Sequence, residues 1–163
     1  MMTCDVFDLL VLVEGRTFRW TVSTDLPGGT RIIVDVSRRY NDTRGDECLW
    51  TLWNDAVLLT PTGPGDRNGA TGTVDIDAGD AQGLSKFSEL LGPYSSGIAT
   101  PIGPAVYVEV TVGARQPMKA FGKNNCNLSG GMVVESGGIN IVRKEAVFSV
   151  EMRREYQPIE VEA

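Results

Sequence analysis

The chain has 163 residues, 42% of them hydrophobic and 22% charged, and its formal net charge is −6. This composition argues against a disordered chain. The acidic balance argues against nucleic-acid binding, because a duplex-binding surface needs a net basic face. The length suits one domain, so we expect residues 1–163 to form a single folded unit.

The N-terminal part of the chain carries clear strand signals. Residues 5–13 are almost continuously apolar, which predicts a fully buried strand, and Glu14-Gly15 predicts a tight hairpin after it. In 16–23 apolar and polar residues alternate, as they do along a strand whose two faces differ. The same alternation continues in 30–40, after a predicted turn.

The middle of the chain combines short strand candidates with one segment of a different kind. Within 80–91 the apolar residues Leu84, Phe87, Leu90 and Leu91 recur at helical spacing, and a Gly-Pro stop follows. We therefore expect one short helix near 80–91 that plugs an end or a side of the sheets. Short strand candidates occupy 49–53, 57–60, 72–77, 132–135 and 139–142.

Two further alternating runs, 104–112 and 145–153, complete the strand pattern. Gly-rich loops separate the elements at 61–69, 93–103 and 113–131. Parallel sheets need crossover helices, and only one helix is predicted. The fold class is therefore predicted to be all-β, an antiparallel β-sandwich of about 8–10 strands with the one short helix.

A resemblance points the same way. Residues 24–40 contain a Leu-Pro-Gly-Gly-Thr turn, alternating apolar residues and then Arg-Arg-Tyr. In this segment the chain resembles a strand pair of uncharacterised bacterial β-sandwich proteins with an immunoglobulin-like or C2-like fold. The resemblance implies a sandwich and brings with it no activity and no functional residue.

The sequence contains no histidine, which excludes Ser-His-Asp and Cys-His catalysis and every His-ligated metal site. Cys4, Cys48 and Cys126 lack zinc-ligand spacing, and an odd number of cysteines is a poor disulfide framework. We expect three reduced, mostly buried thiols. No cofactor is predicted, and we expect that the protein is not an enzyme.

Acidic residues between 75 and 80 leave two alternatives open. Asp75 and Asp77 are two apart on a predicted strand, so their side chains share a face. Either this is a solvated outer face, or the two carboxylates are the paired acids of a hydrolase. Together with Asp80 they also form weak calcium candidates. Gly79 and Lys86 stand where an EF-hand loop needs oxygen ligands.

Two groups are candidates for contact with a partner. Trp50 and Trp53 are three apart, so in a regular strand they point to opposite faces and leave Trp53 as an exposed contact residue. A bulge would instead bury both, together with the third tryptophan. The amide-rich loop with Asn124, Asn125 and Asn127 either contacts a polar ligand or is closed by its own hydrogen bonds.

Charged short motifs add little. Three basic pairs, of which Arg38-Arg39 is one, are interpreted as solvated strand edges and ends. Residues 44–46, Arg-Gly-Asp, match a tripeptide of many integrin ligands, and ordinary turn chemistry is the preferred interpretation.

These observations favour a non-enzymatic binding or interaction module that uses its loops or an exposed sheet edge. The alternatives are a structural or assembly component that forms homo-oligomers, and a carboxylate-based hydrolase. The expected partner is a protein or a small polar ligand, not nucleic acid and not a membrane. The first residues hold no basic region and no long apolar run, so a cytoplasmic location is expected, or a secreted one if a leader was removed.

Overall fold

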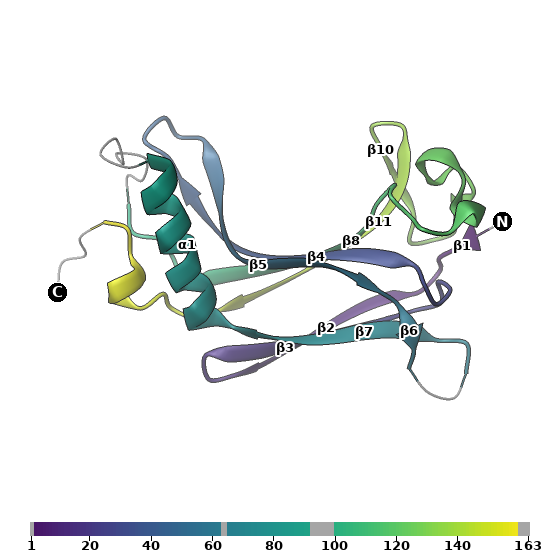
Figure 1. Ribbon diagram of the computed structural model, residues 1–163, viewed down its shortest axis with the longest axis horizontal. Coiled ribbons are helices and arrows are strands. Elements are labelled where there is room, and N and C mark those ends of the chain that lie inside the picture. Colours follow the sequence, from purple (N-terminus) through teal and green to yellow (C-terminus); the bar gives the residue numbers. More distant parts are fainter. Residues whose placement is uncertain (1, 63–64, 92–99, 160–163) are drawn as a thin grey trace.

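Two antiparallel β-sheets stacked face to face make up most of the molecule (Figure 1). The computed structural model describes residues 2–62, 65–91 and 100–159, and within them it holds eleven strands and one α-helix. The predicted all-β sandwich is therefore confirmed, with a helix that begins earlier than expected. Within these residues, no helix is long and apolar enough to cross a bilayer.

The four-stranded sheet has the strand order β2-β3-β7-β6. Its first two strands form the predicted hairpin, with Glu14 opposite Thr17 across a tight turn. Gly15 in this turn has a φ of +62°, a conformation that favours glycine. The strands are β2 (Phe7–Glu14), β3 (Thr17–Thr24), β6 (Thr60–Pro61) and β7 (Asn68–Asp75).

The five-stranded sheet has the strand order β10-β11-β8-β4-β5. Its central strand β8 alternates strictly between buried and half-buried residues, as the sequence pattern of this segment predicts. The short strand expected at 49–53 is part of β5, whereas the one expected at 57–60 is divided between the end of β5 and the start of β6. The strands are β4 (Arg31–Asn41), β5 (Glu47–Leu58), β8 (Ala105–Val112), β10 (Val134–Ser136) and β11 (Ile139–Ser149).

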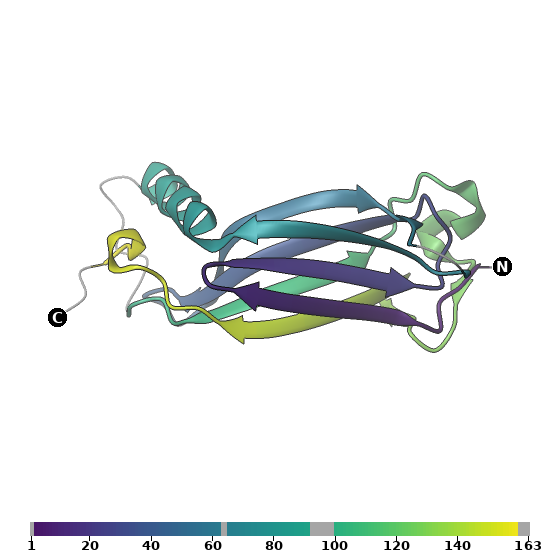
Figure 2. The same cartoon turned by 90° about the horizontal axis from the view of Figure 1, so that it is seen from below.

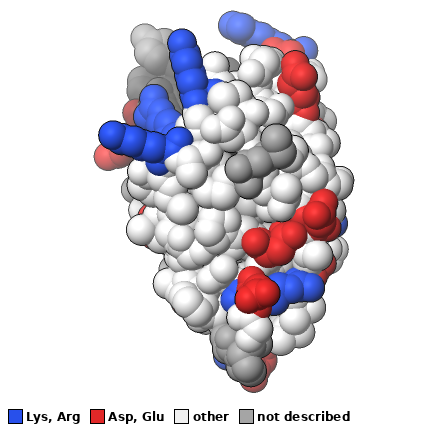
Figure 3. All heavy atoms as spheres, turned by 90° about the vertical axis from the view of Figure 1, so that its right-hand side faces the viewer, with Lys and Arg blue, Asp and Glu red and all other residues white. Residues whose placement is uncertain are grey.

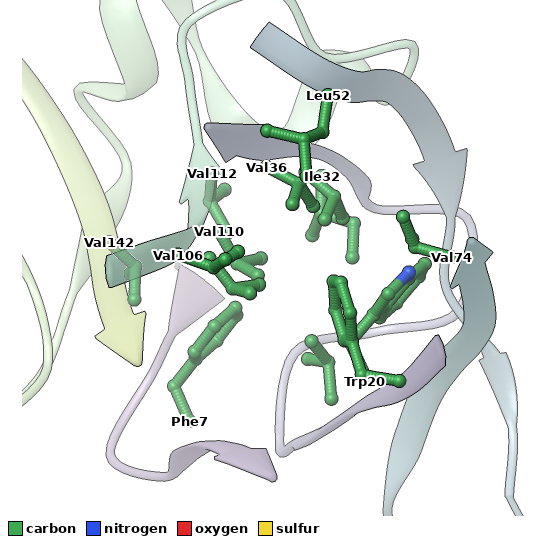
Figure 4. Packing of buried hydrophobic residues seen from close by; sticks show 14 of the residues in the cluster. Phe7, Trp20, Ile32, Val36, Leu52, Val74, Val106, Val110, Val112 and Val142 are labelled. Atoms are coloured by element: carbon green, nitrogen blue, oxygen red, sulfur yellow. The ribbon is translucent and has the colours of Figure 1, made fainter. Parts of the chain in front are cut away.

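The hydrophobic core lies between the two sheets and is built from the inward rows of their strands (Figure 4). Phe7 of β2 and Trp20 of β3 point from one sheet toward the valines of the other. Trp20 is 1% exposed and lies against Gly72 of β7, where an added Cβ would come within 2.7 Å of the indole. Burying one large apolar side chain contributes about 1.5–3 kcal/mol, so these rows supply the main driving force for folding.

A β-bulge in β5 decides where its two tryptophans point. The pairing of β4 with β5 shifts after Val36, and Leu52 becomes an extra residue on β5. Because of this extra residue, Trp50 and Trp53 both point inward although they are three apart. Trp50 is 3% exposed, and the ring centroid of Trp53 lies 6.2 Å from that of Trp20. The bulge is therefore present and turns both side chains inward, but it buries Trp20 and Trp50 and leaves Trp53 half-buried.

The helix α1 (Ile76–Leu91) follows β7 directly and lies across one end of the sandwich, beside β5 (Figures 1 and 2). It begins at Ile76 rather than near 80, because a side chain caps its N-terminus. The Asp75 carboxylate accepts a hydrogen bond of 3.1 Å from the backbone N–H of Ala78. The predicted strand over 72–77 accordingly ends at Asp75.

Two glycines let α1 approach β5 closely. A Cβ added to Gly79 would lie 2.7 Å from the Leu52 side chain, and one added to Gly83 would lie 2.5 Å from Trp50 Nε1. Side chains at these positions would push the helix away from the strand. The bulged Leu52 and the inward Trp50 therefore form the surface on which the helix rests.

A buried ion pair joins β4 to α1. The Arg38 and Asp80 side chains are both 0% exposed, and Nε and Nη2 of the arginine donate to the two carboxylate oxygens at 2.9 Å each. Nη1 donates to the backbone carbonyls of Gly103, Pro104 and Val150. Burial raises the pKa of the Asp80 carboxyl, and the arginine opposes this rise. The interpretation of Arg38 as a solvated strand end is therefore wrong.

The other end of the sandwich is closed by the start of the chain and by the segment that follows β8 (Figure 1). There β1 (Met2–Thr3) pairs in parallel with β9 (Leu128–Ser129). Two short 3₁₀ turns, Lys119–Phe121 and Lys123–Asn125, precede β9. The two ends of the sandwich therefore differ, one covered by a helix and the other by loops.

Candidate functional site

The three carboxylates between 75 and 80 do not come together. Asp75 caps α1, and Asp80 belongs to the buried ion pair. Asp77 accepts hydrogen bonds from Nε of Arg16 at 2.7 Å and Nε of Arg153 at 2.9 Å. Burial would raise the pKa of Asp77, but the hydrogen bonds and charges of these arginines lower it. The shared strand face expected for Asp75 and Asp77 is wrong, since a strand ends and a helix begins between them.

This arrangement also removes the geometric basis of the calcium hypothesis. Calcium needs several oxygen atoms that converge on one point. Among the residues that the structure describes, no group of three or more Asp, Glu or Cys side chains is placed to hold a metal ion. The candidates Asp75, Asp77 and Asp80 serve instead as a helix cap, a surface ion pair and a buried ion pair.

The amide-rich loop is held largely by its own hydrogen bonds. Asn125 is fully buried, and its Nδ2 donates to the carbonyls of Gly113 at 2.7 Å and of Asn140 at 2.9 Å. Asn125 is therefore a structural residue and not a contact residue. Asn124 and Asn127 are exposed, as a contact would require. Seen from this end, charged side chains of both signs surround a largely uncharged area (Figure 3).

The remaining candidates from the sequence lie apart from one another. Trp53 is half-buried beside Trp20, so it offers little surface to a partner. Cys4 is buried, Cys48 is half-buried and Cys126 is exposed, and all three are free thiols. The expectation of mostly buried cysteines is therefore wrong. Burial raises the pKa of the Cys4 thiol to about 11, which makes it a poor nucleophile.

The outer face of the four-stranded sheet carries a row of exposed apolar side chains. Asp8, Leu10, Leu12 and Glu14 of β2 are alternate residues and therefore share this face. Leu10 and Leu12 are each 55% exposed. Of the seven exposed large hydrophobic residues in the described ranges, three lie on β2, the two leucines and Val13. Figure 2 looks onto this face, and none of the described helices lies over β2, β3 or β7.

Polar side chains continue the face beside the leucines. Leu10 stands opposite Thr21 of β3, and Leu12 stands opposite Arg19. One strand further, the hydroxyl of Thr71 lies 3.2 Å from that of Thr21. The face is thus apolar along the edge strand β2 and polar toward its centre.

A hollow of about 370 Å³ opens at the hairpin end of this face. Its wall combines the apolar Leu12 and Val13 with the charged Glu14 and Arg19. Neither charged group takes part in an ion pair with another described residue. The hollow therefore offers apolar surface together with one carboxylate and one guanidinium that are available to a partner.

The apolar run in 5–13 does not predict this exposed face, because such a run is typical of a strand buried on both sides. The pairing of residues across the hairpin does predict it. Residues paired across a hairpin share a face, and the tight turn sets Leu10 opposite Thr21 and Leu12 opposite Arg19. Polar partners of this kind indicate that the leucines face solvent.

Comparisons with known proteins give no family. No family model and no curated protein matches the chain. A solved structure of β-glucosidase 3B from Thermotoga neapolitana in complex with α-D-glucose is similar with 13% identity and a TM-score of 0.39, over 92% of this chain and 16% of that one. A structure of the same enzyme in complex with glucose gives 12% identity and a TM-score of 0.32, over 92% and 17%. The chain spans less than a fifth of those enzyme chains, and similarity at this level identifies neither a fold nor a function.

Proposed function

We propose that this protein is a non-enzymatic protein-interaction module and that the outer face of β2 and β3 is its binding surface. The observation that carries the proposal is the row of Asp8, Leu10, Leu12 and Glu14, two exposed leucines between two carboxylates. Exposed apolar side chains with a polar rim are typical of protein–protein contact surfaces.

An immunoglobulin-like fold is part of the same proposal. The order β2-β3-β7-β6 corresponds to the A-B-E-D sheet of that fold, and the order β11-β8-β4 corresponds to its G-F-C sheet. Domains of this architecture commonly serve recognition through loops, faces or edges of a rigid scaffold. The strand order therefore supports an interaction module on fold-level analogy.

The chemistry of the row also describes the partner. A complementary segment presents two apolar side chains between two basic ones, which then meet Glu14 and Asp8, although Asp8 also lies in an exposed ion pair of 3.7 Å with Arg67. The net charge of −6 attracts such a partner over a longer range. A second copy of this chain fits less well. Whether two such rows pair in parallel or antiparallel, the carboxylates of one row lie opposite the carboxylates of the other.

The leucines alone support only modest affinity. Burying a leucine completely contributes about 1.5–3 kcal/mol, so covering the exposed halves of Leu10 and Leu12 contributes about 2–3 kcal/mol in total. This corresponds to a dissociation constant of about 6–35 mM for a short segment that covers the row. A larger partner that also enters the hollow beside Leu12 binds more tightly.

A titration followed by nuclear magnetic resonance tests the proposal. The probe is the peptide Lys-Thr-Val-Thr-Val-Thr-Lys, which places basic, apolar, apolar and basic side chains on one face of a strand. Backbone resonances of 8–14 and 17–23 are expected to shift. The shifts are expected to disappear in the double variant Leu10→Thr/Leu12→Thr.

Val147→Thr is the matched control, because this valine is 54% exposed on β11, in the other sheet. It is expected to bind like the wild type. Removing the two carboxylates as Asp8→Asn/Glu14→Gln is expected to weaken binding severalfold and to reduce its salt dependence. Shifts confined to 113–131 would show that the loops are the binding surface instead. Shifts of 8–14 and 17–23 that persist in the leucine double variant would show that the two leucines do not carry the binding.

A further inference from the structure

A second surface feature lies between α1 and β5, away from the proposed protein-binding face. It is a cavity of about 220 Å³ whose wall includes Tyr40, Trp50 and Phe87. The ring centroids of Trp50 and Phe87 are 5.7 Å apart, and Tyr40 lies 6.4 Å from Trp50 and 6.3 Å from Phe87 in edge-on arrangements. Rings that hold one another in this way form an apolar wall before any ligand arrives.

The indole of Trp50 lacks a hydrogen-bond partner. Trp50 is 3% exposed, and its Nε1 has no acceptor among the described residues. The nitrogen lies against Gly83, which has no side chain and is itself part of the cavity wall. Buried donors without an acceptor are rare in native folds, and a ligand reaches this one only where the contact between Trp50 and Gly83 opens.

Lys86 gives the cavity its charge. It is the charged residue of the wall, and no described carboxylate lies within 4 Å of it. Asn54 and Thr51 add an amide and a hydroxyl to the same wall. An apolar cavity with a few polar groups at its edge is the usual form of a small-molecule site, and the unpaired ammonium selects an anion.

We propose that this cavity binds a small molecule with one planar apolar body and one carboxylate. The body lies against the rings of Tyr40, Trp50 and Phe87, and the carboxylate pairs with Lys86. This site is independent of the outer face of β2, so either one can fail without the other.

The probe for this site is phenylacetate, and its neutral analogue 2-phenylethanol is the comparison. In a titration of the full chain, phenylacetate is expected to shift the indole N–H resonance of Trp50 and the ring resonances of Tyr40 and Phe87. 2-Phenylethanol is expected to bind more weakly, because it cannot pair with Lys86. The Trp50 resonance is identified as the one that disappears in Trp50→Phe, or by sequential assignment if that variant does not fold.

Two variants separate the parts of the proposal. Lys86→Gln is expected to raise the dissociation constant of phenylacetate about two- to fivefold, as loss of one exposed charge pair does, while Lys119→Gln at the opposite end leaves it unchanged. Phe87→Leu keeps apolar volume and is expected to weaken both probes. The proposal is overturned if 2-phenylethanol binds as tightly as phenylacetate, if Lys86→Gln has no effect, or if the phenylacetate shifts are absent from this cavity.

Discussion

The buried ion pair between Arg38 and Asp80 allows a quantitative test of how α1 is held. Asp80→Asn leaves the charge of Arg38 enclosed at 0% exposure with no opposite charge beside it. Removing one partner of a buried ion pair costs about 3–5 kcal/mol. The total stability of a domain is about 5–15 kcal/mol, so this single change is expected to remove a large share of it.

The double variant Arg38→Met/Asp80→Leu is expected to be less destabilised than either single variant. It removes both charges and fills the space with apolar atoms, although the carbonyls of Gly103, Pro104 and Val150 lose a donor. The two single effects are therefore non-additive, with an interaction energy of about 0.5–3 kcal/mol or more.

Urea unfolding followed by tryptophan fluorescence measures these differences, since Trp50 lies at the contact between α1 and β5. Arg143→Met is the matched control. This arginine on β11 pairs with Glu109 at 3.6 Å while its side chain is 54% exposed, so its loss is expected to cost less than about 1 kcal/mol. Single variants at Arg38 and Asp80 within about 1 kcal/mol of the wild type, or effects that simply add in the double variant, would refute the reasoning.

Three further predictions concern single positions. Gly83→Ala places a Cβ 2.5 Å from the Trp50 indole and is expected to cost about 1–3 kcal/mol in urea unfolding, whereas Gly113→Ala, with no atom within 4 Å of its Cβ, is expected to be nearly neutral. Iodoacetamide at neutral pH is expected to modify Cys126 and to spare Cys4, whose burial raises its pKa to about 11; modification of Cys4 in the folded protein would contradict the packing. Two arginines hold the pKa of Asp77 below its usual value despite burial. The ionised Asp77 therefore stabilises the fold fully at a pH above the ordinary pKa of an aspartate, and this stabilisation is lost as the pH falls through the lowered pKa of the folded protein. Asp77→Asn is therefore expected to be less stable at neutral pH and to lose less stability on acidification, and parallel stability curves would contradict this.

The sheet architecture follows from local patterns in the sequence. Strict alternation in 104–112 and in 16–23 places one row of each strand inward, and the structure buries those rows. The tight turn at Gly15 fixes the pairing of β2 with β3. Such short-range signals suffice for strands that pair with a neighbour in sequence.

Prediction from the sequence fails where tertiary contacts override local patterns. The apolar run in 5–13 predicts a buried strand, but none of the residues that the structure describes forms a second layer over the outer row of β2. The bulge at Leu52 has no local signature, because it depends on how β5 pairs with β4. Arg38 continues the inward row of β4, and a charge is acceptable there because of Asp80 on α1 and three backbone carbonyls, all supplied by segments distant in sequence.

Under the proposed function, the outer face of β2 and β3 contacts another protein. A photo-crosslinking side chain at Thr21, beside Leu10 on this face, tests it most directly in the cells that produce the protein. The control places the same photo-crosslinking side chain at Thr111 in the other sheet. The neighbours of Thr111 in β8 point into the core, so Thr111 itself lies on the outer face of that sheet. The expected result is one adduct to a different protein from position 21, lost in Leu10→Thr/Leu12→Thr and absent from position 111. An adduct from position 111 alone, or an adduct made of two copies of this chain, would contradict the claim.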